Sequence, residues 1–438
     1  MPEPLDPPGS SAPRGLMRLP LRRPRRSFFL YLSFLGPGLI SAAAGDDASG
    51  VATYSVDGAK YGYALLWLIP LITVSLAVVQ EMAARMGAVT GKGFADLVRE
   101  RFTLRMTGCV MLSLLIANSV LIVSEFAGIG AAAELFGIPR WPVILVMAFV
   151  VWWLVVKGNY KRIELVFLVM SLAFIAYPIA AVLAKPDWLE VGKQLVIPSF
   201  HFNHAYLLLL FVATVGTTLT PYMQLYIQSA VAERGLGMEG YKFQRIDAYA
   251  GAIFADVVAA FIIIATGATL FVRHVEVQTA QDAAQALEPL AGPFASYLFA
   301  IGLFGASVLA AAVVPLATTY SMTEAIGFER GVSRNFSEAP VFLGLYTGLI
   351  AFGAIVAMIP GIPVIQLLIV TQVLNGVLLP VELIAIVRLV NDREVMGEHV
   401  NGRIRNVLAY GTVIAISVMS VGYVLVTILA LFGIDFGG

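Results

Sequence analysis

Long apolar stretches separated by short charged loops are the feature that most constrains the fold of this chain. Each stretch has roughly 17–25 residues, enough for a helix to cross about 30 Å of hydrocarbon. The 438 residues are 59% hydrophobic and only 13% charged, whereas soluble domains carry about 25% charged residues. This composition predicts an all-α integral membrane protein. We count eleven stretches, with approximate centres near Gly45, Val74, Leu121, Val150, Phe174, Gly216, Ile262, Gly305, Gly353, Val373 and Ser417.

The distribution of positive charge supports this topology. With eleven crossings and a cytoplasmic N-terminus, 23 of the 28 Lys and Arg residues fall in cytoplasmic loops, as the positive-inside rule requires. We therefore expect a multi-pass plasma-membrane protein with its C-terminus outside. The formal net charge is zero, so no global charge indicates a nucleic-acid partner. The expected partners are the lipid bilayer and a substrate, and we expect the protein to function as a monomer.

Three regions follow from the pattern of apolar stretches. Residues 1–27 are Pro-rich and are predicted to be a disordered cytoplasmic tail. Residues 28–392 would form a transport core of ten transmembrane helices. Residues 393–438 would add an eleventh helix and the C-terminus.

Two of the predicted spans are interrupted at their centres. The first contains Gly45-Asp46-Asp47-Ala48-Ser49-Gly50, and the sixth contains a glycine, four threonines and a proline between Thr214 and Tyr222. Buried acids are costly in lipid, and proline and glycine break helices. Matching breaks in the two halves of a chain indicate an inverted-repeat transporter with its binding site near the bilayer midplane. The eleventh helix would then be an addition to a five-plus-five core.

A bound cation would solve the problem that the first break poses. It would neutralise the acids and accept the backbone carbonyls that the break releases. We expect Asp47 to be a direct ligand. Asp46 is expected to be a ligand, to hold a ligand water, or to make a structural hydrogen bond.

Several segments resemble the natural resistance-associated macrophage protein (NRAMP) family of divalent-metal transporters. The resemblance covers nearly the whole membrane region and implies a LeuT-like fold with broken first and sixth helices. It is carried by the order and spacing of short motifs: Gly36-Pro37-Gly38-Leu39, Asp47-Ala48-Ser49-Gly50-Val51-Ala52-Thr53, Ala59-Lys60-Tyr61-Gly62-Tyr63-Ala64-Leu65-Leu66-Trp67, Val89-Thr90-Gly91-Lys92-Gly93, Ser124-Glu125-Phe126-Ala127-Gly128 and Phe136-Gly137-Ile138-Pro139.

The chain departs from the family's metal site at two positions. The family's Asp-Pro-Gly-Asn motif places its aspartate on Asp47 and its asparagine on Gly50, which offers only a backbone carbonyl. The family's methionine ligand falls on Thr220 or Pro221, depending on the frame. Replacing sulfur with oxygen and adding a second acid suits Mg²⁺, Ca²⁺ or Mn²⁺ better than softer metals. The pattern is most similar to the NRAMP-related magnesium transporter branch.

The remaining predicted site residues would contribute uncharged oxygen atoms. In the family a glutamine of the tenth helix approaches the metal, and here Gln372 stands there with Asn375 three residues later; interhelical hydrogen bonding is the alternative for both. The full set of candidate metal-site residues comprises Asp47, Asp46, the carbonyls of Ala44, Gly50 and Thr217, and the side chains of Thr220, Gln372 and Asn375.

The groups that couple metal entry to protons in the family are largely missing. Glu125 aligns with one retained acid, but Ile122 stands where an aspartate is expected. The histidine positions hold Tyr222 or Met223, and Gln228. We therefore expect transport that is not coupled to protons, with Glu125 hydrogen-bonding within the bundle or serving transport.

The sequence thus predicts a transporter, not an enzyme, that imports Mg²⁺ and also Mn²⁺ by alternating access, driven by membrane potential. No resident cofactor is expected, because the metal is the transported substrate. The alternatives are a proton-coupled Mn²⁺/Fe²⁺ importer of the same family, an ion channel, and, more remotely, an intramembrane aspartyl protease.

Overall fold

The computed structural model describes residues 37–157, 175–199, 213–235, 237–288, 292–329, 331 and 334–432, and these form helices and no strands. Eight long helices cross or nearly cross the fold: α4 (Leu68–Thr90), α6 (Leu104–Leu135), α7 (Arg140–Lys157), α14 (Gly237–Thr266), α17 (Ala295–Ile326), α18 (Pro340–Ala357), α19 (Val364–Asn391) and α21 (Arg403–Leu431). Four half-helices form two pairs: α2 (Pro37–Gly45) with α3 (Ala48–Tyr61), and α12 (Thr214–Thr218) with α13 (Pro221–Arg234). The shorter elements are α5 (Phe94–Arg101), α9 (Ala176–Leu183), α10 (Trp188–Val196), η3 (Gly267–Phe271), α15 (Ala280–Ala284), η4 (Gln285–Leu287), η5 (Gly292–Phe294), α20 (Arg393–Met396) and η6 (Gly397–His399).

The helices reproduce the predicted membrane spans. Within the described ranges, 8 helices are long and apolar enough to cross a bilayer, and the two pairs of half-helices supply the first and sixth spans. The centre of the fifth predicted span, near Phe174, lies outside the described residues, as do the predicted tail at 1–27 and residues 433–438. The all-α, broken-helix architecture is confirmed.

The first break falls on the paired acids. Helix α2 ends at Gly45, and Asp47 is the N-cap of α3 with an extended backbone (φ −68°, ψ −178°). Its side chain accepts a hydrogen bond of 2.6 Å from the amide of Gly50. Aspartate is a favoured N-cap because its carboxylate satisfies an amide that has no helical partner. The paired acids, which are unsuited to a continuous membrane helix, therefore stand at the start of a new helix, α3.

Proline sets the second break. Pro221 is the first residue of α13, directly after the α12 C-cap Leu219 and the α13 N-cap Thr220. Proline is tolerated there because the first amides of a helix have no helical acceptor and the proline φ angle already suits a helix. Both predicted interruptions are confirmed.

The first half of the first span, α2, is attached to the long helix α14. The carboxylate of Asp247, on α14, accepts hydrogen bonds from the amides of Gly38 (2.7 Å) and Leu39 (3.3 Å) at the start of α2. A methyl group on Gly251 of α14 would lie 2.5 Å from the carbonyl oxygen of Gly38. Backbone therefore packs on backbone where α2 crosses α14.

Helix α12 approaches α19 just as closely. A Cβ on Gly216 would lie 2.1 Å from the carbonyl oxygen of Gln372 and 2.6 Å from the amide nitrogen of Gly376. We predict that Gly216→Ala pushes α12 away from α19 and lowers the thermal unfolding midpoint of the purified protein by several degrees, because backbone atoms cannot move aside locally.

The matched control for this substitution is Gly348→Ala on α18, where a Cβ would meet nothing within 4 Å. Alanine is the better helix former by about 1 kcal/mol, so this variant should unfold at or slightly above the wild-type temperature. Equal midpoints for the two variants would show that α12 does not depend on this close contact.

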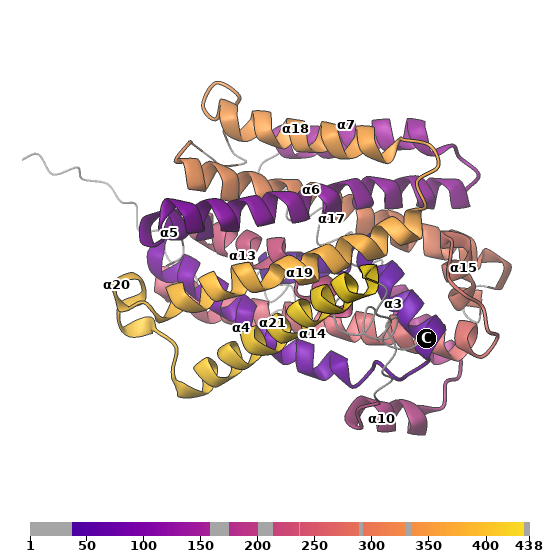
Figure 1. The fold of residues 1–438 in the computed structure, drawn as a ribbon. Coiled ribbons are helices and arrows are strands. Elements are labelled where there is room, and N and C mark those ends of the chain that lie inside the picture. The colour runs from indigo at the N-terminus through magenta and orange to yellow at the C-terminus, as the bar shows by residue number, and fades with distance from the viewer. Residues whose placement is uncertain are drawn as a thin grey trace, which may run out of the picture. The chain divides into compact units, whose positions relative to one another are not determined.

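The short helices lie at the two ends of the long ones. Figure 1 shows α5 and α20 at one end, and α10 and α15 at the opposite end. The first pair is joined by ion pairs from Arg101 of α5 to Asp392 (3.1 Å) and to Glu394 of α20 (2.7 Å). The two helix breaks separate α2 from α3 and α12 from α13.

Candidate cation site

Asp47 is the centre of the candidate site. Its side chain is fully buried, and one oxygen, Oδ1, accepts hydrogen bonds from the Gly50 amide (2.6 Å) and from the side-chain amide of Gln372 (3.2 Å). The other oxygen, Oδ2, has no hydrogen-bond partner among the described residues. A buried carboxylate oxygen without a donor is costly, and a cation is one partner that would satisfy it.

Asp46 lies inside the same break. It is 2% exposed, its amide bonds to the carbonyl of Ala42 at 3.3 Å, and in the described part of the chain its Oδ2 has no donor. Its role as a ligand, as the holder of a ligand water or as a structural hydrogen-bonding group stays a prediction.

The end of α2 presents free carbonyl oxygens. A continuing helix would bond the Ala48 amide to the carbonyl of Ala44, but that amide donates instead to Glu125 at 3.2 Å. The Ala44 carbonyl oxygen therefore does not receive the hydrogen bond from Ala48 that a continuous helix would supply, as is usual at a helix C-terminus. The carbonyl of Gly45, which the sequence analysis did not single out, lies 3.0 Å from the point where a Gly50 Cβ would stand.

Gly50 is closely packed at the first break. It lies in the first turn of α3, where amides point back to the break and carbonyls point away from it. The expected carbonyl ligand at Gly50 stays a prediction. What the glycine allows is close packing: a Cβ there would lie 3.0 Å from Thr217 Cγ2 and 3.4 Å from Asp47 Oδ1, so a larger residue would force these groups apart.

Two threonines bring hydroxyl oxygens to the second break. The hydroxyl of Thr220 donates to the carbonyl of Thr217 at 2.7 Å, which leaves the lone pairs of the Thr220 oxygen available. The hydroxyl of Thr217 is buried and has no partner within the described ranges. The Thr217 carbonyl stays a predicted ligand, since it keeps a second lone pair, and the hydroxyl is a further oxygen that could serve.

Gln372 and Asn375 form a chain of amides next to Asp47. Because a carboxylate only accepts hydrogen bonds, the NH₂ group of Gln372 must face Asp47, and its oxygen accepts from Asn375 at 2.9 Å. Gln372 thus holds Asp47 in this structure, and the approach of its oxygen to a metal or to a ligand water stays a prediction. The Asn375 oxygen is buried and lacks a donor from any described residue.

Two neighbours complete the surroundings. Glu125 is fully buried and hydrogen-bonds within the bundle, to the Ala48 amide (3.2 Å) and the Ser49 hydroxyl (3.5 Å). Met223 packs on the end of α2, since its sulfur lies 2.9 Å from the Cβ position of Gly45. Neither contact is visible in the sequence, because both join residues on different spans.

The site is thus an oxygen-lined break and not a preformed cluster of acids and histidines. Within the described ranges, no group of three or more His, Cys, Asp or Glu residues is placed to hold a metal ion. The available donors are Asp47, helix-end carbonyls and threonine hydroxyls, which are hard ligands. Two opposed helix breaks around buried polar groups define the class of secondary membrane transporters with discontinuous helices.

Comparison with known proteins identifies the group within that class. The profile of the family described as "Natural resistance-associated macrophage protein-like" (Nramp) matches residues 38–426, and the chain belongs to this family. The "Divalent metal cation transporter MntH" of Deinococcus radiodurans is 29% identical, over 95% of this chain and 92% of that protein. The protein of the same name from Bacillus subtilis is 26% identical, over 90% and 92%.

Solved structures agree on the fold. The manganese transporter of Eremococcus coleocola superposes with a TM-score of 0.74 at 20% identity, covering 94% of this chain and 90% of that one. Mhp1, a nucleobase-cation-symport-1 family transporter, superposes with a TM-score of 0.54 at 14% identity, covering 89% and 92%. The second likeness extends the shared fold beyond the Nramp family.

Proposed function

We propose that this protein carries Mg²⁺, and also Mn²⁺, across the plasma membrane into the cell by alternating access. The observation that carries the proposal is the buried Oδ2 of Asp47, which has no hydrogen-bond partner among the described residues, in a chain whose second helix break carries the hydroxyls of Thr217 and Thr220. Mg²⁺ typically binds through one or two carboxylates and keeps several waters. The family relatives named as divalent metal cation transporters support the broader class.

The proposed topology places the end with α5 and α20 (Figure 1) in the cytoplasm, because α5 carries Arg99 and Arg101 and begins shortly after Lys92. The N-terminus would be cytoplasmic and the C-terminus outside. One chain contains both helix breaks, so we propose that a monomer suffices. The cation is the cargo, and no resident cofactor is proposed.

Voltage alone can drive this import. Two charges moving through 100 mV of inside-negative potential gain about 4.6 kcal/mol, enough for roughly 10³-fold accumulation. We predict that Mg²⁺ uptake into proteoliposomes rises with an imposed inside-negative potassium diffusion potential and leaves the internal pH unchanged. An internal magnesium dye and an internal pH dye would be read in parallel.

Protein-free liposomes and a reversed potential are the controls for that measurement. The absence of the family's histidine from α13, where Tyr222 and Gln228 stand, is the reason to expect no proton flux. Metal-driven acidification of the lumen would overturn the uncoupled mechanism while leaving the cation site intact.

One contact favours the second candidate, a proton-coupled Mn²⁺/Fe²⁺ importer. The Met223 thioether lies against Gly45, so a soft ligand stands close to the first break. If it bound the cargo, Cd²⁺ or Fe²⁺ at low concentration would outcompete excess Mg²⁺, and Met223→Leu would abolish that advantage. Saturable, slow Mg²⁺ flux that Met223→Leu does not change would support the Mg²⁺ proposal and exclude a channel.

A further inference from the structure

A buried acid on α19 lies away from the candidate cation site. Glu382 is 4% exposed, and neither carboxylate oxygen has a hydrogen-bond partner among the described residues. It stands ten residues after Gln372 on the same helix, or about 15 Å further along the axis. An intramembrane carboxylate without a partner marks an ion pathway more often than a packing position.

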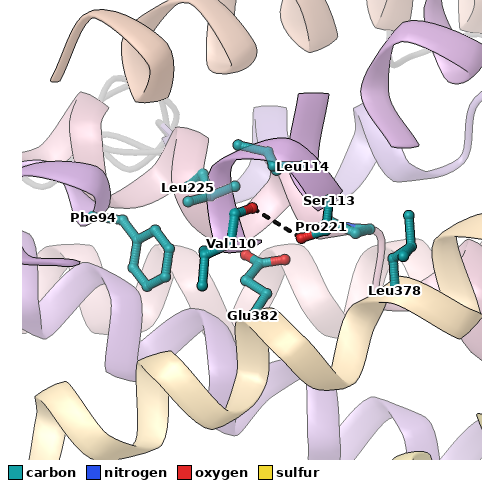
Figure 2. Close-up of a pocket in the computed structure, with 8 residues that line it drawn as sticks. All are labelled: Phe94, Val110, Ser113, Leu114, Pro221, Leu225, Leu378 and Glu382. Atoms are coloured by element: carbon teal, nitrogen blue, oxygen red, sulfur yellow. Dashed lines mark hydrogen bonds between the residues drawn. The ribbon is translucent and has the colours of Figure 1, made fainter. Parts of the chain in front are cut away.

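The carboxylate faces a small cavity. Figure 2 shows Glu382 directed from α19 toward α6 and the start of α13. The cavity offers about 10 Å³ for the centre of a water molecule, which is close to the space that one buried water needs. Its only other polar side chain is Ser113, whose hydroxyl donates to the carbonyl of Val110 at 2.9 Å. The lone pairs of the Ser113 oxygen can still accept a hydrogen bond or bind a cation.

The cavity adjoins the second helix break. Pro221 lines it, and Pro221 directly follows Thr220, one of the candidate ligands. Phe94, the first residue of α5, lines its opposite side. The cavity therefore lies between the break and the end of the fold that carries α5.

Helix α5 closes that side firmly. Glu324 of α17 accepts hydrogen bonds from the Ala95 amide (3.3 Å) and the Ser229 hydroxyl (2.8 Å). This contact ties the start of α5 to α17 and α13. Phe94 itself is 1% exposed, so it separates Glu382 from the loops beyond.

We propose that Glu382 is a second cation station, which receives the hydrated divalent cation from the break and passes it toward the cytoplasm. The inference rests on the proposed function, since it assigns the direction of import. A dication leaving Asp47 must cross a low-dielectric region in which it needs a compensating charge. Carboxylate, hydroxyl and water are the ligands that Mg²⁺ prefers. Movement of α13 during alternating access would enlarge the cavity, because Pro221 forms part of its wall.

The test compares Glu382→Gln and Glu382→Asp with wild type in proteoliposomes, using Mg²⁺ and Mn²⁺ as the probes. We expect Glu382→Gln to lower the maximal uptake rate by about 10-fold while the external KM changes by less than about 2-fold, because loading at Asp47 is untouched. Internal Mg²⁺ should inhibit wild-type uptake, and Glu382→Gln should require about 10-fold more of it. Glu382→Asp, which keeps the charge, should restore most of the rate.

Two controls separate the possible failures. Glu394→Gln removes an exposed acid at the same end, paired with Arg101 at 2.7 Å, and should transport like wild type. Rates are taken per folded protein, judged by the thermal midpoint. Wild-type rates and trans-inhibition in Glu382→Gln, or a raised external KM at an unchanged maximal rate, would overturn the second station. If wild type itself failed to move Mg²⁺, the proposed function would fail instead.

Discussion

Replacing Asp47 with alanine or asparagine is expected to lower Mg²⁺ uptake by about 100-fold or more, the largest effect predicted for any single side chain here. Asp47 supplies the negative charge at the centre of the break, and a cation in low dielectric depends on it. Uptake into proteoliposomes under a fixed inside-negative potential measures the effect directly.

The two variants distinguish transport from folding. Asp47 also caps α3 through the Gly50 amide at 2.6 Å, and losing such a cap costs about 1 kcal/mol. Asparagine keeps an oxygen that can cap the helix but removes the charge. Asp47→Asn should therefore remain as stable as wild type and still fail to transport.

A matched control is available at α15. Asp282 caps that short helix by accepting from the Thr279 amide at 2.8 Å, and Asp282→Asn should not affect uptake. Robust Mg²⁺ transport by Asp47→Asn would mean that the cargo is held elsewhere, and the proposed site would have to be abandoned.

Introducing sulfur at the second break is expected to change which metal the protein prefers. In Thr220→Met a thioether replaces a hydroxyl that now bonds to Thr217 at 2.7 Å. Thioethers favour softer cations, so the Cd²⁺ concentration that half-inhibits Mg²⁺ uptake should fall by about 10-fold, which corresponds to about 1.4 kcal/mol. The maximal rate for Mg²⁺ should fall as well, since the larger side chain crowds a buried position.

Thr220→Val is the control for that change, because it removes the hydroxyl at nearly constant volume and adds no sulfur. It should weaken Mg²⁺ transport without any gain in Cd²⁺ inhibition. If both variants gave the same Cd²⁺ response, residue 220 would not contact the cargo.

The positions of both helix breaks could be read from the sequence. Paired acids next to glycine and a proline after threonine act locally, through the intrinsic preferences of the backbone, so Asp47 and Pro221 were found where expected. The membrane spans of the described residues were equally accessible, because apolar length is summed along the chain.

The contacts inside the site could not be read in the same way. The direction of the Gln372 amide depends on a carboxylate 325 positions away, and the role of Gly45 depends on where Gly50 comes to lie. The direction of the Gly50 carbonyl likewise depends on the course of α3, in whose first turn the residue lies. Such details come from how separate spans meet, and no local pattern in the sequence encodes them.

The first span is held by two different partners, since Asp247 binds the start of α2 and Glu125 binds the start of α3. The break at Asp46 and Asp47 therefore joins two half-helices that are bonded to different long helices, α14 and α6. A tilt of α14 relative to α6 would therefore move α2 with Asp247 and leave α3 with Glu125. Such a tilt would separate the oxygens that the two halves contribute and release a bound cation.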